Sequence, residues 1–452
     1  MGKPAIDKSR LLFDNRFLWN LIAPLFIEVL LSVTIGIADT VMVSSAGEHA
    51  VSGVSLVDAI SNLFIFLFSA FAAGGAVVTS QYLGKKEPEN ACFAAKQLMY
   101  LSLFFSVAVT LLLLILRQPV ISLVYGTIEE DVRASALAYY VPIAISYPFF
   151  AIFSNCTALF RSMGKTKITM QVSIVMNVIN ILGNAVCIYI LKLGALGVGI
   201  ASLASRAVAC VFMLVRTMDK REVIHINDPL RLEVSGSMLY RILRIALPSG
   251  IENSIFHIGK ILVASTVAGF GTASIAASAV INSLATFANV PGNAVNQASV
   301  TVIGQCCGAK EHDQVRYYAR KLLIIAHALT AVTGAALFIL APPIIGLYHL
   351  SAEAYGLALR ITRLHIIHLI LFWPEGFIVT SFLRAAGDVK FPMVVSISSM
   401  FCFRVLFSKI LGVYFGLGLL GVFIGMYMDW YCRIILYAWR FKKGKWEKMT
   451  VV

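Results

Sequence analysis

The chain has 452 residues, of which 59% are hydrophobic and only 13% charged, and its mean hydropathy is +0.84. Soluble domains carry about 25% charged residues, so this composition excludes a soluble globular protein and predicts a polytopic membrane protein. The net charge of +14 lies in short stretches between apolar runs, which argues against a nucleic-acid partner. The eight cysteines show no ligand spacing, so we expect neither a disulfide framework nor a metal site from them.

Apolar runs in chain order predict twelve membrane-spanning helices, because each span needs about 20 mainly apolar residues. The predicted spans are 17–43, 50–83, 97–116, 134–160, 168–191, 195–217, 238–268, 275–305, 319–346, 355–384, 391–412 and 417–440. Lys and Arg gather in alternate loops and in the C-terminal "RFKKGKWEK". This positive-inside pattern predicts that both termini are cytoplasmic and that the protein is multi-pass in a plasma (inner) membrane, which we expect to be bacterial.

The two halves of the chain repeat one another at an almost constant spacing. "SQYLGKKE" (80–87) reappears as "GQCCGAKE" (304–311), "RSMGKTKITM" (161–170) as "RAAGDVKFPM" (384–393), and "LGALGVGI" (193–200) as "LGLLGVFI" (417–424). We therefore predict an all-α fold of two six-helix lobes, residues 1–217 and 238–452, joined by a cytoplasmic linker at 218–237. The second lobe ends in a basic cytoplasmic tail. In such a parallel repeat, substrate sites lie between the halves.

Two carboxylates, Glu28 and Asp39, lie inside the first apolar run, where a charge costs roughly 2.5–3.5 kcal/mol on insertion scales. Glu28 follows Pro24 by one helical turn, and the repeat places Glu252 in the same relation to Pro248. We interpret the two glutamates either as groups facing a shared cavity or as groups that cap unsatisfied backbone or pair with each other. Asp39 has no acidic counterpart in the second half, so we predict that it is the coupling site.

The fifth span carries three amides on one face, since Asn177, Asn180 and Asn184 recur at helical spacing. Such a stripe is typical of helix–helix hydrogen bonding in membranes. The alternative is a polar nest around Asp39, in which Ser202 of the sixth span supplies a further oxygen. We keep both interpretations open, with a sodium ion at Asp39 as the one metal considered.

The second half offers further polar candidates within its spans, namely Glu252, His257, Lys260 and Glu375. We expect Glu28, Glu252 and Glu375 to make the cavity attractive to cations. Lys260 is interpreted either as a partner of Asp39 in one conformational state or as a lysine whose charge snorkels to the membrane surface. No "GxxxxGK[ST]", "HExxH" or "GxSxG" motif is present, so we expect a protein that is not an enzyme.

In order and spacing, several segments resemble the multidrug and toxic compound extrusion (MATE) family over almost the whole chain. They are "IADTVMVSSAGEHAVSGVSL", "SQYLGKKE", "GQCCGAKE", "RSMGKTK", "LRAAGDVK", "LGALGVGIA" and "LGLLGVFIG". The resemblance implies a two-lobed bundle that exports organic, often cationic, drug-like compounds by antiport with sodium ions or protons. It implies an ion site at Asp39 with Asn180, Asn184 and Ser202, and a role for Glu252. Some members have a second acid where this chain has Asn184.

We therefore expect a secondary active exporter working by alternating access, with a small organic substrate, membrane lipids as its surroundings, no cofactor and a functional monomer. Two alternatives remain. A flippase or exporter of a lipid-linked or anionic metabolite would suit the cation Lys260, whereas a channel would show steady current without exchange.

Overall fold

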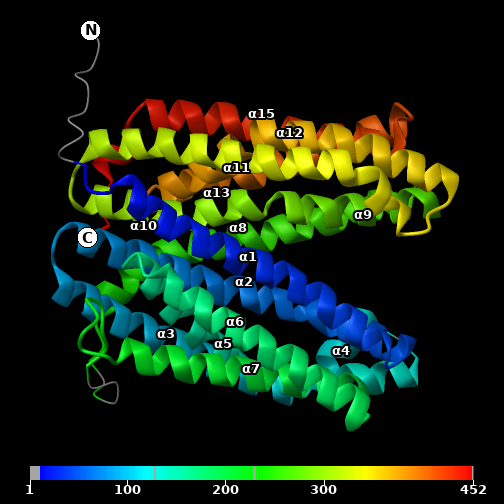
Figure 1. Cartoon of the computed structure of the whole chain (residues 1–452), viewed down its shortest axis with the longest axis horizontal. Helices are drawn as coiled ribbons and strands as arrows, with labels where there is room; N and C mark the ends of the chain where they lie inside the picture. Colours follow the sequence, from blue (N-terminus) through cyan, green and yellow to red (C-terminus); the bar gives the residue numbers. More distant parts are fainter. Residues whose placement is uncertain (1–10, 127–128, 228–230, 232, 450) are drawn as a thin grey trace. The chain divides into compact units, whose positions relative to one another are not determined.

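The computed structural model describes residues 11–126, 129–227, 231, 233–449 and 451–452, and within these the chain is helical with no strand (Figure 1). It divides into two compact units. The N-terminal unit is Trp19–Gly250, and the C-terminal unit is Ile251–Val452 together with the described residues up to Leu18. The lobe and linker limits predicted from the sequence stay a prediction.

The N-terminal unit is built around α5, which packs on α2, α3, α6 and α7. Its elements are α1 (Asn15–Ser44), α2 (Glu48–Gly84), α3 (Pro88–Ile115), α4 (Arg117–Tyr125), α5 (Glu130–Ser162), α6 (Thr166–Ala185), the π-helical η2 (Val186–Ile190) and α7 (Gly194–Thr217). The helix α1 begins in the segment assigned to the C-terminal unit and continues unbroken through Pro24. Apolar residues such as Leu21, Leu25 and Phe160 are fully buried in this unit.

The C-terminal unit repeats that plan around α12, which packs on α9, α10, α11 and α15 (Figure 1). Its elements are the part of α8 (Gly236–Ala268) from Ile251 onward, α9 (Thr272–Ala288), α10 (Val290–Gly308), α11 (His312–Gly346), α12 (Ala352–Ala385), α13 (Lys390–Ser399), η3 (Met400–Val405), α14 (Leu406–Lys409), η4 (Ile410–Tyr414), α15 (Gly418–Lys442) and the 3₁₀ turn η5 (Lys445–Lys448). The segments η3 and η4 are π-helical.

The spans agree with the twelve predicted from the sequence. Ten described helices are long and apolar enough to cross a membrane, and α9 with α10 forms one more, bent by 47° at the break before Pro291. Proline removes a helical hydrogen bond, which accounts for a bend at this point. The twelfth is α8, whose 33 residues include the polar Glu252, His257 and Lys260 that lower its hydropathy.

The repeat is visible in the backbone. Lys86 and Lys310, at the ends of "LGKK" and "CGAK", both adopt positive φ, 62° and 58°. The π-helices η2 and η4 also occupy equivalent positions, since the repeat aligns Val186 with Ile410. The segment η3 has no such counterpart, because the equivalent stretch of α6 is regular α-helix in the described structure. One π-helical turn therefore distinguishes the two halves.

Candidate functional site

Asp39 on α1 lies at the end of a hydrogen-bonded chain of side chains from α6 and α7. Asn184 Nδ2 donates to Asp39 Oδ1 at 2.6 Å and to Asn180 Oδ1 at 3.3 Å. Asn180 Nδ2 donates in turn to Ser202 Oγ at 3.3 Å. The structure thus brings together four of the five residues predicted for the coupling site, which we call the Asp39 cluster.

The Asp39 cluster is rich in oxygen atoms. Asn184 Oδ1 is buried and accepts no hydrogen bond within the described structure. Asn177, the fifth predicted residue, is buried one helical turn before Asn180 but has no hydrogen bond to the cluster. Among the described residues no group of three or more His, Cys, Asp or Glu side chains is placed to hold a metal ion. Hard cations prefer oxygen ligands, so an ion here would rely on one carboxylate with amide and hydroxyl oxygens.

Sequence reasoning missed Arg206 and Tyr139, which lie near this cluster. Arg206, one turn after Ser202 on α7, and Asp58 on α2 both lie within electrostatic range of Asp39. Tyr139 donates to Asp58 Oδ1 at 2.9 Å, and Arg206 donates to Ser146 Oγ at 2.7 Å. The sequence did contain a signal for Arg206, because an arginine within the apolar run "ASLASRAVACV" is as costly in a membrane as an acid.

Glu28 and Glu252 are not free carboxylates. Arg161 donates to Glu28 Oε1 at 2.6 Å, and Arg384 donates to Glu252 Oε2 at 2.5 Å. Glu28 also accepts from Thr169 at 2.9 Å. These equivalent pairs tie the first helix of each half to the end of its fourth span. The expectation that these glutamates attract a cationic substrate needs revision, since each charge is already neutralised within its own unit.

The remaining acid and the histidine of the predicted site, Glu375 and His257, lie on different helices. Glu375 on α12 is bound to His327 Nε2 of α11 at 2.6 Å. The sequence analysis did not predict His327. Its contact with Glu375 means that this acid, too, already has a basic partner. His257 lies on α8 one turn before Lys260, partly exposed, and does not line the pocket that Lys260 lines.

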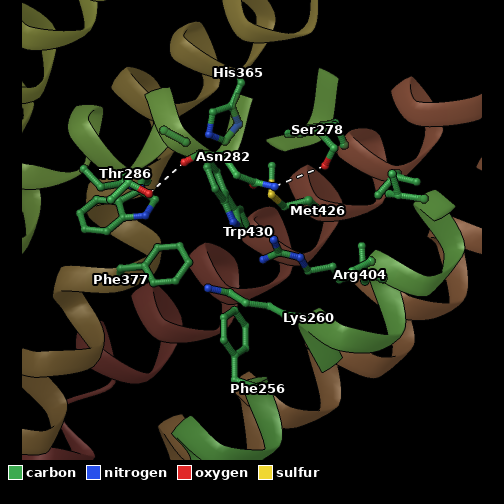
Figure 2. A pocket seen from close by; sticks show the side chains of 18 of the residues that line it. Phe256, Lys260, Ser278, Asn282, Thr286, His365, Phe377, Arg404, Met426 and Trp430 are labelled. Carbon is green, nitrogen blue, oxygen red and sulfur yellow. Dashed lines mark hydrogen bonds between the residues drawn. The ribbon is translucent and has the colours of Figure 1, made fainter. Parts of the chain in front are cut away.

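Lys260 lines an open pocket of about 550 Å³ inside the C-terminal unit. Figure 2 shows Lys260 of α8 and Arg404 of η3 pointing into the same space, with Phe256, Phe377 and Trp430 around them. The other residues that line this pocket are Val263, Ala264, Val267, Ser278, Asn282, Ala285, Thr286, Asn289, Asn293, His365, Trp373, Val422, Phe423 and Met426. None of these described lining residues is Asp or Glu, and we call the space the Lys260 pocket.

Close helix packing places the two cations side by side. A Cβ built on Gly259 would lie 2.4 Å from Met400 Cε and 2.8 Å from its Cγ, so glycine allows α8 to approach the start of η3. Arg404 follows one turn later. Sequence reasoning missed Arg404, although "SMFCFRVLFSKIL" places an arginine inside an apolar run.

Comparisons with known proteins agree with this architecture. The family model described as MatE matches residues 24–186 and 248–410, which covers more than half of the chain and matches it twice. An uncharacterized transporter, YisQ of Bacillus subtilis, is 29% identical, with 98% of each chain covered. A probable multidrug resistance protein, NorM of Thermotoga maritima, is 25% identical, covering 96% of this chain and 93% of the relative.

Solved structures share the fold at lower identity. A MATE family transporter in an outward-facing conformation has a TM-score of 0.89 at 21% identity, covering 96% of both chains. A MOP superfamily transporter from Pyrococcus furiosus, whose structure is described as having a binding pocket of reverse polarity, also has a TM-score of 0.89 at 21% identity, with 96% and 97% covered. With the duplicated family match, these findings establish that the chain belongs to the MATE family of multi-pass membrane transporters.

Proposed function

We propose that this protein is a secondary active exporter of small organic compounds, driven by antiport of sodium ions or protons at the Asp39 cluster. The family assignment supports transport, and the names of relatives support efflux. Besides the Thermotoga maritima relative, MepA of Staphylococcus saprophyticus is named a multidrug export protein and is 22% identical over 83% of this chain. We further propose that it works as a monomer in the plasma membrane with both termini in the cytoplasm.

One observation carries the choice of Asp39. In the described part of the chain, Glu28 and Glu252 each form an ion pair with an arginine and Glu375 contacts His327 at 2.6 Å, whereas Asp39 forms no ion pair. A carboxylate in a membrane-spanning helix without an ion-pair partner is costly, and such residues mark ion and proton pathways. Arg206 acts on Asp39 only through the longer-range field.

The cluster explains how an ion would be held and released. Asn184 Nδ2 orients the Asp39 carboxylate while its own Oδ1 faces no donor among the described residues, and Asn180 links that amide to Ser202. A proton or a sodium ion would neutralise Asp39, and this changes the cost of burying the Asp39 side chain against α6. Because an ion shifts a conformational equilibrium only through its differential affinity for the two states, the ion must bind one access state more tightly.

The test is exchange in proteoliposomes. Purified protein is reconstituted, and the efflux of ethidium and of 2-naphthoate is followed under a sodium gradient at equal pH and under a pH gradient without sodium. Asp39→Asn keeps the shape but removes the ionisable group, so we expect exchange to fall at least 100-fold.

Glu48→Gln is the matched control, because Glu48 is an exposed acid at the start of α2 that contributes to neither site. We expect it to transport as well as the unchanged protein. Full exchange by Asp39→Asn would overturn the coupling assignment, and a steady current without exchange would favour a channel.

A second candidate, export of an anionic or lipid-linked metabolite, is favoured by one observation. The Lys260 pocket holds two cations and no acid among its described lining residues. This candidate changes the substrate and leaves the proposed coupling site as it is.

A further inference from the structure

We propose that the Lys260 pocket is a binding site for a small organic anion with an aromatic or flat apolar body. The proposal rests on the proposed transport function for its physiological meaning, because an exporter must hold its substrate in one of its units or between them. Its physical basis lies in the C-terminal unit alone, where all the residues that line the pocket are found.

The two cations of the pocket lack an anionic partner among the described residues. Neither Lys260 nor Arg404 forms an ion pair there. Asp429 interacts with Arg404 only at longer range. Its hydrogen bond is with Arg433, whose Nε donates to Asp429 Oδ1 at 2.8 Å. The pocket therefore carries a positive charge that its own residues leave unbalanced.

An aromatic ring holds these charges together in place of an acid. Lys260 Nζ lies 5.5 Å and Arg404 Cζ lies 5.6 Å from the centroid of the Phe256 ring. Cation–π contacts favour a cation over a ring face, so Phe256 lowers the cost of two neighbouring positive charges. The ring supplies no negative charge, so an anion that enters the pocket is attracted by both cations.

Several hydrogen-bond donors around the pocket are unused. Arg404 Nε and Trp430 Nε1 are buried N–H groups with no acceptor in the described part of the chain, and His365 Nδ1 is also without a partner there. Buried polar groups are normally satisfied. A carboxylate, sulfonate or phosphate offers several acceptor oxygens, which suits a site with spare donors.

The walls of the pocket fit a flat apolar body. Trp373 and Phe377 stack with ring centroids 5.0 Å apart, and Phe377 meets Trp430 edge to face at 5.9 Å. Gly292 leaves room for the Trp373 ring, because a Cβ at this position would lie 2.2 Å from Trp373 Cζ3. The volume of about 550 Å³ falls within the roughly 300–1,000 Å³ typical of small-molecule pockets.

The experiment measures charge preference with one ring system. Purified full-length protein in phosphatidylcholine nanodiscs is titrated by calorimetry with 2-naphthoate, naphthalene-2-methanol and 2-naphthylmethylammonium. We expect naphthoate to bind at least tenfold more tightly than the alcohol and the ammonium. The proposal would be overturned if the ammonium bound as tightly as naphthoate or more tightly. It would also be overturned if all three compounds bound with the same affinity.

Variants locate the preference in the pocket. We expect Lys260→Gln and Arg404→Gln each to weaken naphthoate binding about tenfold with little change for the alcohol, and Lys260→Arg to retain it. Lys409→Gln and Arg363→Gln are the matched controls, because both residues are exposed and lie outside the Lys260 pocket close in sequence to its residues. Loss of binding in these controls to the same extent would contradict the assignment. Melting temperature and size-exclusion profile check that each variant is folded.

One further outcome is decisive. A titration with short-chain phosphatidylglycerol that displaces naphthoate and binds more tightly in a Lys260-dependent way would assign the site to an anionic lipid and overturn the small-molecule proposal. Calorimetry needs neither an ion gradient nor turnover. A failure of coupling at Asp39 in proteoliposomes is therefore distinguishable from a failure of anion binding at Lys260.

Discussion

The two halves of the chain share one frame, but the region around Asp39 in the N-terminal unit carries an acid where the corresponding region of the C-terminal unit carries cations. In the N-terminal unit the frame holds Asp39 with Asn180 and Ser202. The alignment that pairs the two "LG" loops, 193–200 with 417–424, gives the C-terminal unit Val263, Arg404 and Met426 at those positions, and all three line the Lys260 pocket. Lys260 itself corresponds to Gly36.

This difference separates what the fold needs from what function needs. We interpret features present in both halves, such as the Glu28–Arg161 and Glu252–Arg384 pairs, as parts of the shared six-helix frame. Features present in one half cannot be needed for that frame, because the other half forms without them. The unshared residues are an acid with amides in one unit and two cations in the other, and this suggests that the two units bind different charged species.

The largest expected effect is the loss of stability when either of the two equivalent ion pairs is broken. Removing one partner of a buried pair costs about 3–5 kcal/mol. Since Arg161 and Arg384 keep 25% and 22% of their side chains exposed, we expect the lower end of that range, about 3 kcal/mol, for Glu28→Gln and for Glu252→Gln. Thermal unfolding in a fixed detergent measures both.

Glu375→Gln is the control for the ion pairs, because Glu375 and His327 are 35% and 30% exposed and we expect a smaller loss. If the three variants lose the same stability, or if only one half depends on its pair, the two units do not share this part of the frame.

The next effect concerns equivalent glycines. A Cβ on Gly421 would lie 2.6 Å from Gly412 N, and one on Gly197 would lie 2.7 Å from Cys187 Cβ. Overpacking costs about 1–3 kcal/mol, while replacing glycine inside a helix gains only about 0.5–1 kcal/mol. We therefore expect Gly421→Ala and Gly197→Ala each to lower the melting temperature.

Gly356→Ala is the matched control, since nothing lies within 4 Å of the added Cβ in α12. The helix gain is then unopposed, so stability should rise slightly. A rise for all three glycine variants would show that the two close contacts can relax.

The last effect concerns ion affinity, not stability, and sharpens the difference between the halves. Asn184→Ala removes the amide that contacts Asp39, whereas Asn177→Ala removes a buried amide of the same helix that does not. A hydrogen bond to a charged group contributes about 1.5–3 kcal/mol, so the apparent affinity for the driving ion should change about tenfold for Asn184→Ala. Exchange rates against ion concentration measure this, and equal effects of the two variants would place the ion elsewhere.

Much of the architecture followed from the sequence. Apolar runs gave the twelve spans, although the break before Pro291 was not predicted and the polar residues of α8 weaken its signal. The duplicated loops predicted the repeat, which the positive φ values of Lys86 and Lys310 confirm. The contact of Asp39 with Asn184 was also foreseeable, because helical spacing put the three amides on one face and the family resemblance pointed to Asp39.

The sequence by itself determined the class of protein, its spans and its repeat, because hydropathy and spacing are properties of neighbouring residues. It also located Glu28, Asp39, Glu252 and Glu375 within the spans. Only the tertiary structure decided which charges are balanced. Arg161 lies 133 residues from Glu28 and Arg384 lies 132 residues from Glu252, so no local pattern could show these acids neutralised. Packing of α8 on η3 likewise put Lys260 beside Arg404 with no acid among the described lining residues, and so revealed a cationic pocket where the sequence predicted an acidic cavity.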